Sequence, residues 1–191
     1  LALDRLTGSP VRVASVANFP AGRADIAAAV REVRAVSVAG AHEVDVVIPY
    51  RLVGSETALL RRFLVEVRAA AGTMTLKFIL ETGMLGSPDR IAVAAREAIT
   101  AGADFIKTST GKVPVNATPE AAAVMLDAID QAGGSCGFKA AGGGASVADA
   151  ATYIALAGER LGAGWVTSQR FRIGASGLLD ALLAVLDGEA R

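Results

Sequence analysis

The chain repeats one unit: a short run of β-branched and apolar residues, a polar or glycine-bearing turn, and then a stretch with helical periodicity. About six such units follow one another at a period of about 30 residues, which is typical of a βα repeat. The predicted strands span residues 11–16, 44–48, 74–80, 104–108, 137–140 and 164–167. The predicted helices span residues 24–39, 56–71, 88–101, 119–132, 146–161 and 177–186. This alternation predicts an α/β fold with a parallel sheet and right-handed crossovers.

Two architectures fit the alternation, an open doubly wound sheet and a closed (β/α)8 TIM barrel. An open sheet concentrates its site at one switch point, whereas a barrel brings all its strand ends to one mouth. Polar residues lie on or after many of the predicted strands: Asn18, Asp45, Lys77, Lys107, Lys139 and the segment after Thr167. The chemistry therefore favours the barrel, with about six of its eight βα units in this chain.

The length fits one domain. With 191 residues, 52% of them apolar, the chain can bury a sizeable core. Residues 1–8 read as the end of a helix that leads into the first predicted strand. We therefore expect a single barrel domain over residues 1–191 that is N-terminally incomplete and lacks the first two strands of the eight.

Composition argues against several function classes. The 19 basic and 19 acidic residues leave no electrostatic reason to bind nucleic acid or an anionic membrane. No run approaches the ~20 apolar residues of a membrane span, and residues 1–10 lack the features of a signal peptide. Cys136 has no second cysteine to pair with, which favours a cytoplasmic location. His42 has no His or Cys at ligand spacing, so no metal is expected.

The most informative segment is Asp104-Phe-Ile-Lys-Thr-Ser-Thr-Gly-Lys112. Lys107 lies within an otherwise apolar strand, where an unpaired ammonium group is costly. One interpretation is a buried stem whose ammonium group finds a carboxylate. The other is an amine kept partly neutral so that it can attack a carbonyl group.

A second lysine favours the activated amine. Lys139 lies in the next strand, in Gly137-Phe-Lys-Ala140, and neighbouring strands are ~4.8 Å apart. The two ammonium groups can therefore approach one another, and a like charge nearby lowers an amine pKa. The residues alone predict an activated lysine without deciding between Lys107 and Lys139.

Asp45, in Glu43-Val-Asp-Val-Val-Ile-Pro-Tyr50, adds a carboxylate on a third strand. It can serve as an ion-pair partner of Lys77 or Lys139, and it can also shuttle protons during cleavage of a carbon–carbon bond. Lys77 lies in the middle of its strand, which offers no other catalytic group. We interpret it as an electrostatic partner of Asp45 rather than as a nucleophile.

Three glycine-bearing loops after strands form a candidate phosphate site: Thr110-Gly-Lys112, Ala141-Gly-Gly-Gly144 and Ile173-Gly-Ala-Ser176. Glycine lets backbone N–H groups approach a phosphate closely, and barrel enzymes commonly bind phosphate with the loops after their last two strands. Each loop alone fits a simple turn. Their succession, with Lys112 in the first, favours phosphate.

Six segments resemble deoxyribose-phosphate aldolase, in the same order along the chain. They are the three strand segments around Asp45, Lys107 and Lys139, together with Asn18-Phe-Pro20, Val115-Asn-Ala-Thr-Pro119 and Ile173-Gly-Ala-Ser176. The resemblance runs from about residue 3 to about residue 186. It implies a (β/α)8 barrel without metal or organic cofactor that reversibly cleaves 2-deoxy-D-ribose 5-phosphate to acetaldehyde and D-glyceraldehyde 3-phosphate. Aldehyde and sugar-phosphate substrates are then the expected partners, and the oligomeric state, a homodimer included, stays open.

The resemblance also implies roles for single residues. Lys107 would form the Schiff base, Lys139 would lower its pKa, and Asp45 would shuttle protons with Lys139 and water. The expected phosphate contacts are Gly111, Lys112, Gly142, Gly143, Gly174 and Ser176.

Three departures from the family pattern bear on these roles. We expect the family's aspartate-containing first strand and the terminal tyrosine of some members to be missing, because the sequence runs from Leu1 to Arg191 and neither feature occurs in it. Gly144 and Ala145 stand where the family usually has an aliphatic residue and an arginine, so we expect a weaker phosphate preference.

Two alternatives remain at this point. A transaldolase-like lysine aldolase would share the barrel and the imine but would not need the second lysine. A catalytically impaired barrel fragment would bind sugar phosphates or self-associate through its open sheet edges.

Overall fold

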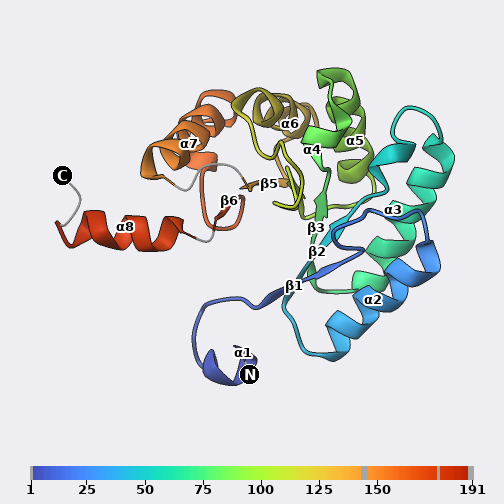
Figure 1. Cartoon of the computed structure of the whole chain (residues 1–191), viewed down its shortest axis with the longest axis horizontal. Coiled ribbons are helices and arrows are strands. Elements are labelled where there is room, and N and C mark those ends of the chain that lie inside the picture. The colour runs from blue at the N-terminus through green and yellow to red at the C-terminus, as the bar shows by residue number, and fades with distance from the viewer. Residues whose placement is uncertain (1, 143–145, 176, 189–191) are drawn as a thin grey trace.

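A computed structural model describes residues 2–142, 146–175 and 177–188 of the chain. Its centre is one parallel sheet with the strand order β1-β2-β3-β4-β5-β6, as Figure 1 shows. The strands are β1 Ala14–Ala17, β2 Glu43–Val47, β3 Thr75–Ile79, β4 Phe105–Lys107, β5 Gly137–Ala141 and β6 Phe171–Gly174. The α/β class is confirmed, and the described residues form six parallel strands, the number expected from the sequence. The eight strands of a complete barrel stay a prediction.

Helices connect consecutive strands. The α-helices are α1 Ala2–Arg5, α2 Ile26–Val38, α3 Thr57–Ala71, α4 Thr82–Leu85, α5 Pro88–Thr100, α6 Pro119–Gln131, α7 Val147–Leu161 and α8 Leu178–Leu186, with 3-10 turns η1 Tyr50–Leu52 and η2 Ala163–Trp165. Side chains cap several N-termini: Ser87 accepts from the N–H of Arg90 at 3.3 Å, and Thr118 accepts from that of Ala121 at 3.2 Å.

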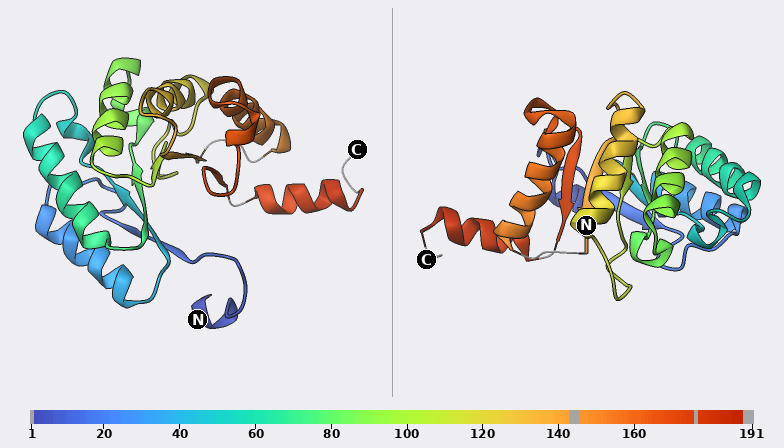
Figure 2. Two further views of the ribbon diagram at one scale, coloured as in Figure 1. Left: turned by 180° about the vertical axis from the view of Figure 1, so that it is seen from behind. Right: turned by 90° about the horizontal axis from the view of Figure 1, so that it is seen from above.

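The sheet is curled into a half-barrel. In Figures 1 and 2, α2, α3, α5, α6 and α7 follow one another along the outer side of the sheet, and α8 extends away from them beyond α7. Outward-facing strand residues such as Leu76, Phe78 and Phe138 are fully buried against these helices. Because side chains alternate along a strand, the residues between them point to the concave face, and many of those are charged.

The strand predicted at residues 164–167 is wrong. Residues Ala163–Trp165 form the 3-10 turn η2, in which the indole N–H of Trp165 donates to the carbonyl of Gly134 at 2.8 Å. The edge of β5 pairs instead with β6, in the register Phe138↔Phe171 and Lys139↔Arg172. A short apolar run that follows closely spaced glycines fits a turn as well as a strand, and the tertiary hydrogen bond of Trp165 selects the turn.

Candidate active site

Four charged residues meet on the concave face of the half-barrel, each from a different strand: Asp45 from β2, Lys77 from β3, Lys107 from β4 and Lys139 from β5. Asp45 is in register with Lys77, and Lys107 is in register with Lys139. Residues in register on neighbouring strands share a face, and therefore both pairs point inward.

Asp45 is the centre of this cluster. One carboxylate oxygen, Oδ1, accepts from Lys77 Nζ at 2.7 Å. The other, Oδ2, accepts from Lys107 Nζ at 3.0 Å and from Lys139 Nζ at 2.8 Å. Strands β2 and β5 are not neighbours in the sheet, so the contact between Asp45 and Lys139 depends on the curl that brings these strands together.

The electrostatics of Asp45 follow from these contacts. Burial raises the pKa of its carboxyl group, but the charges of Lys107, Lys139 and Lys77 and the hydrogen bond from Lys139 outweigh burial. The pKa of Asp45 therefore lies well below its ordinary value, and the group is a carboxylate at neutral pH.

Lys139 is shifted in the direction that favours a neutral amine. Burial lowers its pKa below the ordinary value, and the like charges of Lys107 and Lys77 add to the effect, while Asp45 opposes it. Lys139 thus belongs to a site in which positive charge is crowded around one carboxylate.

Lys77 is enclosed between two carboxylates. Its Nζ lies 2.5 Å from Glu43 Oε2 and 2.7 Å from Asp45 Oδ1, and its side chain is 1% exposed. The predicted ion pair with Asp45 is therefore confirmed. The side chains of Lys107 and Lys139 are 10% and 17% exposed, so these two amines rather than Lys77 are reachable by a substrate.

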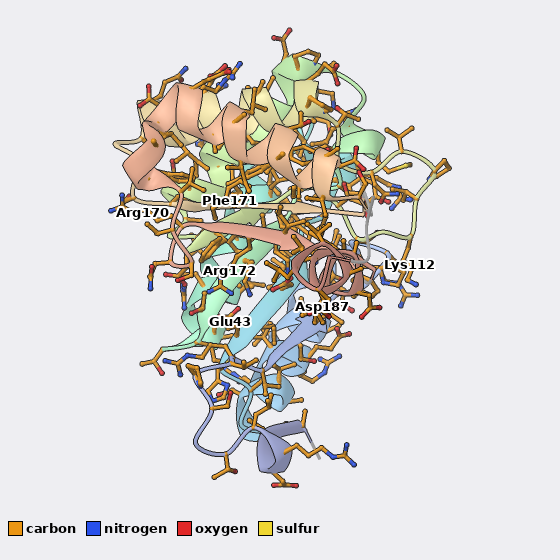
Figure 3. All side chains as sticks on the ribbon, turned by 90° about the vertical axis from the view of Figure 1, so that its left-hand side faces the viewer. Glu43, Lys112, Arg170, Phe171, Arg172 and Asp187 are labelled. Atoms are coloured by element: carbon orange, nitrogen blue, oxygen red, sulfur yellow. The ribbon has the colours of Figure 1, made fainter. Side chains whose placement is uncertain are left out.

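Three of the predicted phosphate residues, Gly111, Gly142 and Gly174, lie at or just after the carboxyl ends of β4, β5 and β6. A Cβ placed on Gly142 would lie 2.9 Å from Gly111 Cα, so the loops after β4 and β5 touch at these glycines. A Cβ on Gly174 would lie 3.1 Å from Lys139 Cε. Lys112 is exposed and lies at the end of the sheet away from Arg170 (Figure 3). Gly143 and Ser176 lie outside the described residues.

Two carboxylates near this cluster were missed at the level of sequence. Glu43 is 4% exposed, and it contacts Lys77 and also Arg172 Nη2 of β6 at 3.5 Å. The signal for it was its position two residues before Asp45, which places both on one face of β2. Figure 3 shows Glu43 and Arg172 on the inner side of the sheet.

Glu81 is the second missed carboxylate. It is fully buried and has a left-handed backbone (φ +56°), which is unusual for a residue other than glycine. Its Oε1 accepts from the N–H of Thr110 at 3.1 Å, while Oε2 has no hydrogen-bond partner among the residues that the structure describes. Glu81 therefore holds the loop after β4, next to Gly111. The sequence feature that could have indicated Glu81 is a carboxylate directly after the strand predicted at residues 74–80.

Two other polar residues have structural roles. His42 Nδ1 accepts from the N–H of Val13 at 2.9 Å. Burial raises the pKa of the Cys136 thiol to about 12, so this cysteine is a core residue and not a nucleophile.

Within the described ranges, no three His, Cys, Asp or Glu residues gather as a metal site would require. Likewise, no helix in those ranges is long and apolar enough to cross a membrane.

The fold is thus an α/β half-barrel, and its inner face carries one carboxylate in contact with two partly exposed lysines. Residues 2–183 match the model of the DeoC/LacD family aldolases, and the chain belongs to this family.

Solved structures agree with this assignment. A crystal structure from Toxoplasma gondii, provisionally described as a deoxyribose-phosphate aldolase, is 26% identical with a TM-score of 0.88, over 98% of this chain and 75% of the other. One from Coccidioides immitis, described in the same provisional way, is 27% identical with a TM-score of 0.86, over 97% and 68%. The tetrameric deoxyribose phosphate aldolase of Aeropyrum pernix is 25% identical with a TM-score of 0.78, over 97% and 71%.

Proposed function

We propose that the chain is a class I aldolase that cleaves 2-deoxy-D-ribose 5-phosphate reversibly to acetaldehyde and D-glyceraldehyde 3-phosphate, with Lys107 as the Schiff-base lysine. The observation that carries the proposal is the pair of reachable amines, Lys107 and Lys139, on one oxygen of Asp45. The family membership supports aldolase chemistry, and the similar structures suggest the substrate.

The proposed reaction starts with attack by the neutral Lys107 amine on the aldehyde carbon of the open-chain sugar. Loss of water from the resulting carbinolamine gives an imine, and a proton from an acidic group of the site or from water converts it to the cationic form, which withdraws electrons from the bond to be cleaved. A base removes the proton of the C3 hydroxyl, the C2–C3 bond breaks, and its electron pair enters the enamine while glyceraldehyde 3-phosphate leaves. Protonation of the enamine carbon and hydrolysis then release acetaldehyde and the free amine.

Lys139 and Asp45 supply what this sequence needs around Lys107. Lys139 Nζ contacts the same carboxylate oxygen as Lys107 Nζ, at 2.8 Å and 3.0 Å, so a second amine lies directly beside the proposed nucleophile. Asp45 is a carboxylate at neutral pH in hydrogen-bond contact with both amines, which is the geometry of a proton shuttle. The substrate phosphate would bind at the loops that carry Gly111, Gly142 and Gly174.

The test is an assay of glyceraldehyde 3-phosphate and acetaldehyde release from 2-deoxy-D-ribose 5-phosphate. We expect release by the wild-type chain and a loss of about 10³-fold or more in kcat for Lys107→Met. Lys112→Met, at the exposed phosphate-side lysine, serves as the comparison and should mainly raise KM. No release, or a Lys107→Met variant as active as the wild type, contradicts the proposal.

The same assay with free 2-deoxy-D-ribose measures the phosphate preference. Because Gly144 and Ala145 replace the family's aliphatic residue and arginine, we expect a smaller ratio of kcat/KM between the phosphorylated and the free sugar than in arginine-bearing relatives. Restoring the cation with Ala145→Arg should raise the ratio by lowering KM for the phosphorylated sugar. A ratio as high in the wild-type chain as in arginine-bearing relatives contradicts this expectation.

A further inference from the structure

Glu43 is a buried carboxylate for which the proposed reaction has no role. It lies on β2 with its side chain 5% exposed, one inward-facing position before Asp45 towards the N-terminal end of the strand. Its oxygens contact Lys77 Nζ at 2.5 Å and Arg172 Nη2 at 3.5 Å. A buried carboxylate is retained at low cost only when it is paired, and both partners of Glu43 are cations.

The contacts of Glu43 continue into the lysine site without a gap. Lys77 bridges Glu43 Oε2 and Asp45 Oδ1, and Asp45 Oδ2 then meets Lys107 and Lys139. Lys77 is fully buried, so it has no access to water that could replace either carboxylate. Losing Glu43 would therefore leave Lys77 with Asp45 as its remaining carboxylate among these contacts.

The position of Arg172 supports the same reading. It is in register with Lys139 on the neighbouring strand, yet its guanidinium group lies over the ring of Phe105, 5.3 Å from the centroid, and reaches Glu43. A Cβ on Gly137 would lie 2.4 Å from that ring, so a residue without a side chain leaves the space that Phe105 fills. Arg172 is thus directed to Glu43 and away from the amines.

We propose that Glu43 is a positioning residue that acts on the nucleophile through Lys77. By balancing the charge of Lys77, it keeps Oδ2 of Asp45 directed to Lys107 and Lys139 and keeps the Asp45 charge available to them. The proposal rests on the proposed function, because it assigns Glu43 a role in setting the pH at which Lys107 becomes a free amine.

The charges around Lys107 determine the direction in which each substitution should shift the pH profile. The charged groups on the strands around Lys107 are Glu43 and Asp45 on β2, Lys77 on β3, Lys139 on β5 and Arg172 on β6, with Glu81 and Lys112 in the adjoining loops. Removing the negative charge of Glu43 makes this surrounding more positive, which favours the neutral amine. Removing the positive charge of Lys77 has the opposite effect.

The experiment is the pH dependence of imine formation, measured as the rate at which acetaldehyde and borohydride modify Lys107. We expect Glu43→Gln to move the acid limb of the profile to lower pH by about 0.5 unit or more, Lys77→Met to move it to higher pH, and the double variant to return it close to the wild type. Glu66→Gln removes an exposed charge on α3 and should leave the profile unchanged. Thermal unfolding of each variant verifies that it is folded.

The proposal is overturned if Glu43→Gln has the same pH profile as the wild type, or if Glu43→Gln and Lys77→Met shift the profile in the same direction. A merely structural role would change the amount of folded protein but would not shift the two profiles in opposite directions. The apparent pKa of Lys107, from residue-resolved acetylation with acetic anhydride, gives a readout that needs no imine. If the variants shift the acetylation-derived pKa of Lys107 as expected but no imine forms, the proposed function is contradicted and the role of Glu43 is supported. If an imine forms but the variants do not shift that pKa, the role of Glu43 is contradicted and the proposed function is supported.

Discussion

Asp45 is the residue on which the charged cluster depends. It is 2% exposed and accepts hydrogen bonds from three ammonium groups. Lys77 also contacts Glu43, whereas the ion pairs of Lys107 and Lys139 in the described part of the chain are with Asp45. Removing the charge of Asp45 would therefore leave these two largely buried amines without a counter-charge. The consequence concerns both stability and chemistry.

For Asp45→Asn we predict a loss of about 3–5 kcal/mol in the free energy of unfolding at pH 7 and a fall in kcat of about 10² or more. The pKa of Asp45 is lower in the folded than in the unfolded chain, so its stabilisation is present above the unfolded value of 3.8 and declines as the pH falls below it. Denaturant titrations of both chains should therefore show a difference that shrinks below about pH 4. A difference that stays constant down to pH 2 contradicts this account.

At the scale of elements, the loops after β4 and β5 form one unit. The Thr108 hydroxyl donates to the carbonyl of Ala141 at 3.2 Å and accepts from its N–H at 3.0 Å. Gly142 follows directly, with φ +75°, and its Cα faces Gly111 and Asn116. Two loops that are locked together in this way present their backbone N–H groups as one surface.

Gly142→Ala tests this locking. A Cβ there would lie 2.7 Å from Asn116 Oδ1 and 2.9 Å from Gly111 Cα, so both loops must move. We predict a several-fold rise in KM for the phosphorylated sugar with a small change in KM for free deoxyribose. The matched control is Gly54→Ala, which has φ +84° and no atom within 4 Å of its Cβ, so it carries only the backbone strain of about 1 kcal/mol. Equal kinetic effects of the two substitutions contradict the prediction.

The elements also show what the sequence could predict. The polar strand positions predicted the meeting of Asp45, Lys107 and Lys139, because alternation and register follow from a parallel sheet. Glu43 and Arg172 were missed because their contact crosses from β2 to β6, and such a distance depends on the curl of the whole sheet. The strand at residues 164–167 was wrong because the Trp165 hydrogen bond to Gly134 is tertiary and leaves no local signal.

At the scale of the whole molecule, burial is uneven. Every residue of β2 is buried, and β3 and β4 lie between two paired neighbours. On α8, by contrast, Leu179 is 64% and Leu186 is 80% exposed. Local stability follows burial and hydrogen bonding, so the middle of the sheet should open only with global unfolding.

Hydrogen exchange followed by mass spectrometry tests this gradient. We predict the slowest amide exchange in peptides from β2, β3 and β4, at rates set by global unfolding, and exchange at least about tenfold faster in α8. Peptides from α5 are the matched helical control, because α5 packs against the sheet and α6. Protection of α8 equal to that of α5 contradicts the prediction.

The central claim is that Lys107 forms the imine. The most direct measurement is borohydride reduction in the presence of acetaldehyde, followed by peptide mass mapping. We predict an ethyl adduct on Lys107, its loss in Lys107→Met, and no adduct on the enclosed Lys77. An adduct on Lys139 alone would reverse the roles of the two amines, and no adduct on any of the three lysines would contradict the Schiff-base mechanism.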